Sequence, residues 1–264
     1  MKKILLILTL SIFSFASNLP INSVVKIFST VSDQNYLEPW ENPKIYNLTG
    51  SGAIIKDNRI LTSAHVVSGA NFVEVQKEND SKKYDATVKY ISNDVDLAIL
   101  EVNDKTFFAD TKPLEISEDI KIKDSVTAIG YPVGGNTLST TNGIVSRIEY
   151  RNYIWNPWAQ YMTIQVDAAI NSGNSGGAII DKDNKLIGIA MMKLTNTDNI
   201  AYIVPSVVIN TFLNDIKDNK VDGFASTQTM IDHIENQSLK DYLGLQDNFG
   251  VLITRADIED VEFK

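Results

Sequence analysis

The chain has 264 residues, a formal net charge of −9 and no cysteine. Its 44% hydrophobic and 22% charged residues are ordinary for a soluble globular protein and argue against wholesale disorder. The lack of cysteine excludes disulfides, thiolate metal sites and cysteine nucleophiles. Because no cluster of Lys and Arg supplies a basic face, we expect no nucleic-acid partner. The two histidines, His65 and His233, are far apart and form no metal-ligand cluster, so we expect neither a metal nor a cofactor.

Residues 1–16 have the pattern of a secretory signal peptide. Lys2 and Lys3 supply the positive start, residues 4–15 form an apolar stretch, and a small residue stands at Ala16. The stretch is shorter than the roughly 20 residues of a membrane-spanning helix, so an uncleaved membrane anchor is the less favoured alternative. We predict a periplasmic location, with at most a peripheral contact to the membrane.

Between residues 21 and 204, short apolar runs alternate with turn residues. The runs are rich in Val, Ile and Tyr, and several alternate apolar with polar residues, as residues 87–91 do. This pattern is typical of strands in an all-β sandwich or barrel. We expect strands at residues 53–55, 72–75, 86–91, 97–102, 125–129, 143–148, 161–166, 178–180 and 186–191.

Helical periodicity appears only in the last third of the chain. Pro205 suits the first turn of a helix, and Gly223 is the expected stop signal. Between them, apolar residues recur at helical spacing: Val208, Ile209, Phe212, Leu213 and Ile216. Beyond Gly223 we predict a short helix at 239–243 and a strand at 250–254.

Residues 171–177, with the sequence NSGNSGG, have the composition of a sharp turn that exposes a serine hydroxyl. Ser175 is flanked by glycine, and Gly173 can aim its N–H, together with that of Ser175, at a developing oxyanion. A flexible turn without a catalytic role is the alternative that this motif alone leaves open. We take Ser175 as the candidate nucleophile and Gly173 and Ser175 as the candidate oxyanion hole.

A serine nucleophile needs a base, and the base needs an orienting carboxylate. His65 is the one histidine before Ser175, although a histidine satisfied within the core would look the same in sequence. Asp96 opens an apolar run and is expected to be buried with a partner, whereas Asp94 is expected to be solvated. We therefore predict a catalytic triad of His65, Asp96 and Ser175.

The triad residues follow one another along the chain in the order His, Asp, Ser. That order is the one found in chymotrypsin-type proteases, and it differs from the order in subtilisin and the α/β-hydrolases. Together with the β-rich pattern, it predicts an all-β fold with a chymotrypsin/trypsin-like double β-barrel and a C-terminal helix.

Seven ordered segments resemble the HtrA/Deg serine proteases of bacterial envelopes and plant organelles. Two departures from the family pattern, Ser172 and Ala178, touch no catalytic atom. The matching segments are residues 50–55 (GSGAII), 61–67 (LTSAHVV), 94–100 (DVDLAIL), 128–132 (AIGYP), 141–146 (TNGIVS), 165–177 (QVDAAINSGNSGG) and 201–205 (AYIVP).

The resemblance implies an ATP-independent serine endopeptidase that degrades unfolded or damaged envelope proteins. It also implies a homo-oligomer built from trimers, for which the aromatic residues Tyr36, Trp40 and Tyr46 are candidate contacts. Residues 223–264 resemble an incomplete PDZ domain. We divide the chain into a signal peptide at 1–16, a trypsin-like protease domain at 17–222 and a partial PDZ-like segment at 223–264.

The resemblance also suggests which residues bind substrate. In this fold the position six before the nucleophile, Ala169, lines the base of the primary pocket, and Ile189, Ala190 and Met191 form the opposite wall. None is charged, so we expect small or medium aliphatic residues before the cut. Unfolded proteins expose such residues and folded ones bury them, which suits protein quality control.

Two other functions remain open at this stage. The chain could be a chaperone or holdase that binds unfolded proteins without cutting them, although a pure binder has no need of a triad. It could also be a latent protease whose oxyanion turn orders only with a peptide or an oligomer contact. For His233 we favour a solvated surface position, and for Trp155 and Trp158 a core or hairpin position.

Overall fold

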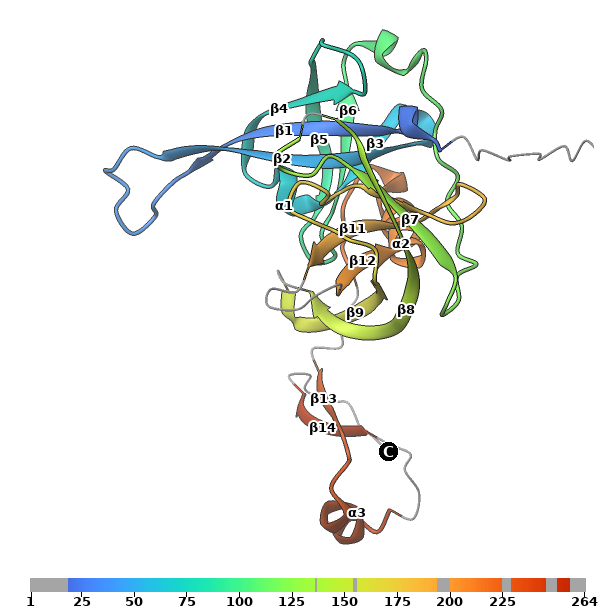
Figure 1. Cartoon of the computed structure of the whole chain (residues 1–264). Helices are drawn as coiled ribbons and strands as arrows, with labels where there is room; N and C mark the ends of the chain where they lie inside the picture. Colours follow the sequence, from blue (N-terminus) through green and yellow to red (C-terminus); the bar gives the residue numbers. More distant parts are fainter. Residues whose placement is uncertain are drawn as a thin grey trace, which may run out of the picture.

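Two closed, antiparallel, six-stranded β-barrels make up most of the protein (Figure 1). The computed structural model describes residues 19–135, 137–153, 156–193, 200–224, 229–245 and 251–256. The strand order is β1-β2-β3-β6-β5-β4 in the first barrel and β10-β11-β12-β9-β8-β7 in the second. The predicted double-barrel fold is therefore confirmed.

Along the strands of the first barrel, side chains point alternately inward and outward. In β5, for example, every second residue is less exposed than its neighbours, and Tyr90 and Ser92 are buried. The outer half of β2 is exposed, because β1 and β2 extend past the barrel as a long hairpin (Figure 1). Its elements are β1 (Val24–Asp33), β2 (Lys44–Ile55), β3 (Arg59–Thr62), α1 (Ala64–Val67), β4 (Ala70–Lys77), β5 (Tyr84–Ser92) and β6 (Leu97–Val102).

The second barrel contains every strand predicted between residues 125 and 191. Its longest strands, β8 and β9, run well beyond the predicted cores at 143–148 and 161–166 because they pair with each other as a long hairpin. Trp155 lies outside the described residues, so its position stays a prediction, as do those of the side chains of Trp158 and His233. The strands are β7 (Ser125–Gly130), β8 (Ser139–Tyr153), β9 (Asn156–Val166), β10 (Ala178–Ile180), β11 (Leu186–Lys193) and β12 (Ala201–Pro205).

Three apolar clusters hold the barrels and join them. One fills the first barrel around Ile27, Ile60 and Leu100, and another fills the second around Ile164 and Ile203. The third lies between the barrels and takes residues from both, among them Leu61, Leu97, Ile129, Ile189 and Val204. The relative position of the two barrels is therefore set by burial of apolar surface.

Helix α2 (Ser206–Asp215) closes the cluster between the barrels. Pro205 was predicted for its first turn and is instead the N-cap, one position earlier, with an extended backbone. A 3-10 turn, Ile216–Asp218, follows and ends at Asn219, whose φ of 69° lies in the left-handed region. The predicted stop at Gly223 is therefore wrong, because Asn219 tolerates this conformation and ends the helix four residues earlier. The Tyr90 hydroxyl donates a hydrogen bond of 2.9 Å to Asn219 Oδ1, which ties this end to the first barrel.

A two-stranded sheet and one helix follow the second barrel. Strands β13 (Thr229–His233) and β14 (Val251–Ala256) pair in antiparallel fashion, and α3 (Gln237–Leu243) lies between them in sequence. Asn236 caps α3 by accepting from Leu239 N, and Gly244 ends it with a φ of 69°. The predicted helix and strand are confirmed, whereas the PDZ-like identity and the domain limits remain predictions.

Phe212 tests how far stability depends on the cluster between the barrels. Its side chain is fully buried there, so Phe212→Ala should lower the free energy of unfolding by about 3–5 kcal/mol. Val207, on the same helix, is 38% exposed, so Val207→Ala should change it by less than about 0.5 kcal/mol. Denaturant unfolding followed by circular dichroism measures both free energies. A loss for Phe212→Ala as small as that expected for Val207→Ala would show that α2 is not part of this core.

Candidate active site

His65 and Asp96 form a tightly bonded pair in the first barrel. His65 lies on the short helix α1, and Asp96 lies in the turn before β6. The ring atom Nδ1 of His65 is 2.8 Å from Asp96 Oδ2 and 2.9 Å from Oδ1, and the backbone N–H of His65 also donates to Oδ1 at 2.9 Å. Asp96 therefore fixes both the ring and the backbone of His65.

Burial distinguishes the two partners of this pair. The side chain of Asp96 is fully buried, whereas that of His65 is 25% exposed and can be reached from outside. A carboxylate against Nδ1 favours the tautomer with its proton on Nδ1, which leaves the lone pair of Nε2 to accept a proton. Asp94 is exposed, as the sequence suggested. Of the two carboxylates, the geometry therefore assigns the buried one, Asp96, to the histidine.

Ser175 lies in the turn 171–177 that joins β9 to β10 in the second barrel. Its hydroxyl is 3.4 Å from Met191 O on β11. Strand β11 also holds the turn through two backbone bonds of 2.8 and 2.9 Å, from Gly176 N to Ala190 O and from Ala190 N to Gly177 O. Ser63, two residues before His65, donates to the same Ala190 carbonyl at 3.2 Å.

The turn also touches the first barrel directly, next to α1. The N–H of Ser51 on β2 donates to Ser175 O at 2.9 Å. A Cβ at Gly50 would lie 2.5 Å from Val66 Cγ1 on α1 and 3.2 Å from Ser175 O in the turn. The backbone of Gly50 therefore lies between α1 and the turn, with no space for a side chain. The structure thus brings Ser175 up to the helix that carries His65.

Gly173 has a backbone conformation that only glycine fits. Its φ is +93°, and a Cβ there would come within 2.5 Å of Tyr131 O and 2.6 Å of Val133 N, so no other residue fits. The preceding carbonyl, that of Ser172, accepts from Val133 N at 2.7 Å. Because C=O and N–H point in opposite directions across a trans peptide, the N–H of Gly173 points away from Val133.

Two buried tyrosines near these residues stay protonated at neutral pH. Burial, together with the negative charge of Glu78, raises the pKa of Tyr131 well above its usual value. Burial also raises the pKa of Tyr153, with a further contribution from the charge of Asp96. Neither phenol therefore acts as a base at neutral pH.

The four residues predicted to bind substrate lie in different environments. Ala169 is exposed in the segment before the turn, and its carbonyl accepts from Thr141 Oγ1 at 2.9 Å. Ile189, Ala190 and Met191 are buried on β11. Ala190 shares a core cluster with Ala168 and Ile170, the two neighbours of Ala169 in sequence, but among the described core clusters and hydrogen bonds none includes Ala169 with these three residues. Their role as a pocket remains a prediction.

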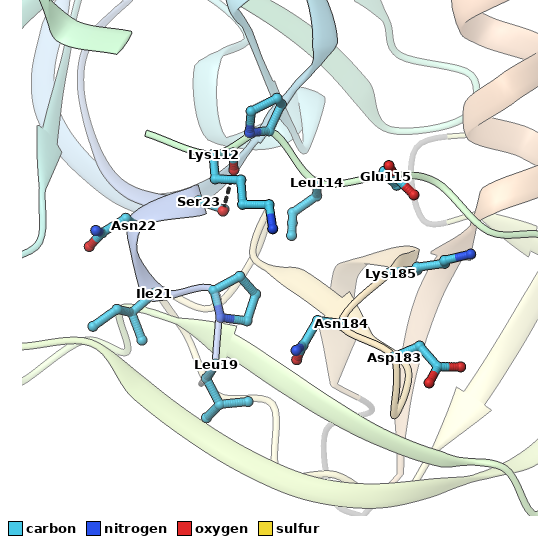
Figure 2. A pocket seen from close by; sticks show the side chains of 12 residues that line it. Leu19, Ile21, Asn22, Ser23, Lys112, Leu114, Glu115, Asp183, Asn184 and Lys185 are labelled. Atoms are coloured by element: carbon cyan, nitrogen blue, oxygen red, sulfur yellow. Dashed lines mark hydrogen bonds between the residues drawn. The ribbon is translucent and has the colours of Figure 1, made fainter. Parts of the chain in front are cut away.

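A hollow of about 610 Å³ lies away from these residues (Figure 2). The entry segment (residues 19–23), the connection at 112–115 and the turn at 183–185 line it, and no member of the predicted triad does. Figure 2 shows the Ser23 hydroxyl bonded to the Lys112 carbonyl, which fastens the entry segment to the connection. The hollow is therefore not the predicted catalytic site.

Within the described ranges, no group of three or more His, Asp or Glu side chains could hold a metal ion. Over the same residues, no helix is both long and apolar enough to cross a bilayer. The arrangement that the structure does show is a histidine bonded to a buried carboxylate, on a helix that the glycine-rich turn of Ser175 approaches. Such an arrangement can activate a hydroxyl for acyl transfer.

Sequence reasoning missed Ser51 and Val133 as contacts of the nucleophile turn. Ser51 is part of the GSGAII segment, which carried weight only as a family match, and Val133 gave no signal because its backbone makes the contact. A small polar residue between two glycines in an otherwise apolar strand was the one available hint for Ser51.

Comparison with known proteins agrees with this geometry. The family model described as "Trypsin-like peptidase domain" matches residues 50–189, so the chain belongs to the trypsin-like peptidase family. Within it, the chain is similar to "Protease Do-like 4, mitochondrial" of Arabidopsis thaliana, with 40% identity over 94% of this chain and 48% of the relative. It is also 39% identical to the "Serine protease DegP homolog" of Plasmodium falciparum, over 88% of this chain and 28% of that protein.

Solved structures support the same family. The active form of the Rv3671c protease from M. tuberculosis matches with a TM-score of 0.63 and 26% identity, over 75% of this chain and 82% of that one. The HtrA-type protease AlgW with decapeptide, at 24% identity, shows the fold alone, with a TM-score of 0.67 over 89% and 76% of the two chains. The prediction of an HtrA/Deg-type serine protease is confirmed at the level of the family. The chain spans about half the length, or less, of the curated relatives described above.

The choice between the two carboxylates can be tested directly. Asp96→Asn removes the charge that stabilises the protonated ring of His65, so kcat should fall by roughly 10⁴. Asp94→Asn, at the exposed neighbour, should leave kcat within about twofold of the wild type. Initial rates on a fluorogenic peptide measure both, and a larger loss in Asp94→Asn would show that the wrong aspartate has been assigned.

Proposed function

We propose that the protein is an ATP-independent serine endopeptidase that degrades unfolded or damaged proteins of the cell envelope. The observation that carries the proposal is the bonded pair of His65 and Asp96 beside the turn of Ser175. Membership of the trypsin-like peptidase family supports it.

The proposed reaction is acyl transfer in two steps. The Ser175 hydroxyl attacks the peptide carbonyl while its proton passes to Nε2 of His65, and Asp96 stabilises the imidazolium that forms. The proton then goes to the leaving amine, the peptide bond breaks, and an acyl-enzyme ester remains. A water molecule repeats the sequence in place of the serine and releases the new carboxylate.

The N–H groups of Gly173 and Ser175 would stabilise the oxyanion in both steps. The support for Gly173 is the hydrogen bond from Val133 N to the Ser172 carbonyl. Since C=O and N–H point in opposite directions across this peptide, the N–H of Gly173 points away from Val133. Backbone donors held in place before the reaction need no reorganisation in the transition state, which makes them effective.

We propose small or medium aliphatic residues before the cut. The support is the uncharged character of Ala169, Ile189, Ala190 and Met191. Folded proteins bury such aliphatic residues, so a protease with this preference selects unfolded chains.

For assembly we propose a homo-oligomer built from trimers. The exposed aromatic residues of the β1–β2 hairpin support it: Tyr36 is 88% exposed and Trp40 is 80% exposed. Large apolar side chains gathered on one surface are typical of protein interfaces.

For location we propose the periplasm, on the pattern of residues 1–16, which lie outside the described residues. The Do-like 4 relative is named as mitochondrial and Do-like 2 as chloroplastic.

The nucleophile gives the first test. Purified protein should cleave reduced casein after aliphatic residues, and Ser175→Ala should lower kcat by a factor on the order of 10⁶, because only binding and the oxyanion hole remain. Mass spectrometry of the products identifies the cut sites. Cleavage by neither protein, with both preventing aggregation of the casein, would show a holdase instead. Labelling by a serine-directed phosphonate only when peptides are added would show a latent protease.

Location has a separate test. When the chain is produced in a Gram-negative host, the periplasmic protein should begin at Ser17, as shown by N-terminal sequencing. Ala16→Tyr should block cleavage, because a signal peptidase needs a small residue there, while Asn18→Gln should not. A wild-type protein that stays in the cytoplasm with residues 1–16 attached would contradict the proposal.

A further inference from the structure

Ser51, a fully buried serine of β2, binds the nucleophile turn through both its backbone and its side chain. Its N–H donates to Ser175 O at 2.9 Å, and its hydroxyl donates to Gly173 O at 2.8 Å. The same hydroxyl accepts from Tyr131 N at 2.8 Å, and the Ser51 carbonyl accepts from Thr62 Oγ1 at 2.7 Å. One residue of the first barrel thus bonds to both candidate oxyanion residues of the second.

The side chain of Ser51 acts on the orientation of Gly173 from two directions. Glycine rotates easily, so the direction of its N–H depends on how the two flanking peptides are held. The N–H of Val133 donates to the Ser172 carbonyl, in the peptide before Gly173. The Ser51 hydroxyl donates to the carbonyl of Gly173 itself, in the peptide after it. Through its second bond, to Tyr131 N, the hydroxyl also fixes the segment that contains Val133.

The backbone of the second barrel packs closely around Ser51. A Cβ at Gly130 would lie 2.9 Å from both Ser51 Oγ and Asn174 Oδ1. A Cβ at Gly176 would lie 2.2 Å from both Ser51 O and Thr62 Oγ1. Removing the hydroxyl would open a space the size of one oxygen atom, which is too small for water to bridge the two partners. The Tyr131 N–H and the Gly173 carbonyl would then be left unpaired in a buried site.

We propose that Ser51 is a positioning residue that holds the N–H of Gly173 toward the oxyanion from across the barrel interface. The proposal rests on the proposed function, because it concerns the same reaction. Unpaired and buried, the Gly173 carbonyl gains by rotating toward another donor. It belongs to the Gly173–Asn174 peptide, whose N–H also bonds to Asn171 O at 2.9 Å, so the rotation pulls on the turn and shifts Gly173 together with its own N–H. The loss should fall on the transition state, where the oxyanion exists, and spare ground-state binding of the substrate.

The test compares Ser51→Ala with wild type on one aliphatic peptide substrate. We expect kcat to fall by roughly 10- to 100-fold, less than the complete loss of an oxyanion donor, while KM changes by less than about threefold. Thr163→Val is the matched control, because Thr163 is also buried and its hydroxyl donates to a backbone carbonyl, that of Glu149, at 3.1 Å. It should lower the thermal midpoint similarly and leave kcat within about twofold.

A second readout separates positioning from general loosening. A peptidyl trifluoromethyl ketone forms a hemiketal oxyanion with Ser175, so its affinity for Ser51→Ala should fall by the same factor as kcat/KM. The affinity of the product peptide that leaves as the amine, which has no negative oxygen at the cut, should not change. If Ser51→Ala does not fold, Ser51→Cys takes its place, since a thiol fills the site and is a weak donor; its kcat should also fall, with KM unchanged.

The possible outcomes distinguish this proposal from the proposed function. A wild-type protein that cleaves nothing overturns both. A wild-type protein that cleaves, with Ser51→Ala equal to it in kcat, overturns only the role of Ser51. Equal losses in Ser51→Ala and Thr163→Val, or parallel losses for ketone and product peptide, would make Ser51 merely structural and would also overturn the proposal.

Discussion

The contact between the turn 171–177 and strand β2 is the constraint on which the candidate site depends. Two glycines of the second barrel keep it close: a Cβ at Gly176 would lie 2.2 Å from Ser51 O, and a Cβ at Gly130 would lie 2.9 Å from Ser51 Oγ. Ser51 adds hydrogen bonds across the same boundary. Because interiors pack this closely, the turn has one position relative to the first barrel, and a small displacement of either would be felt by both.

This contact matters because the predicted triad is divided. His65 and Asp96 belong entirely to the first barrel, whereas Ser175 belongs to the second. The pair within one barrel is aligned by three local hydrogen bonds. The alignment of Ser175 with that pair depends instead on the apolar cluster between the barrels and on α2, which closes it. The interface between the barrels, more than either barrel alone, therefore determines the geometry of the candidate site.

The fold and the pairing of His65 with Asp96 could be predicted because their signals are local. Alternating apolar residues indicated the strands, and the glycine-rich turn, the lone early histidine and the aspartate before an apolar run indicated the triad. The ends of elements were harder to predict: the 3-10 turn after α2 ends at Asn219 and the helical segment does not reach Gly223, because either residue can adopt the left-handed conformation and Asn219 is held by Tyr90. Ser51 and Val133 could not be predicted as site contacts, since their bonds join segments far apart in sequence, partly through the backbone.

The division of the triad between the barrels also has a consequence for folding. The six strands of either barrel can close on their own core, but the interface cluster needs residues from both. The candidate site is therefore complete only when the barrels are docked, because docking brings the turn of Ser175 up to α1. A chain whose barrels have not docked lacks the complete predicted triad, because neither barrel alone contains it. For the proposed protease, docking would therefore decide when exposed segments, its own or those of its neighbours, can be attacked.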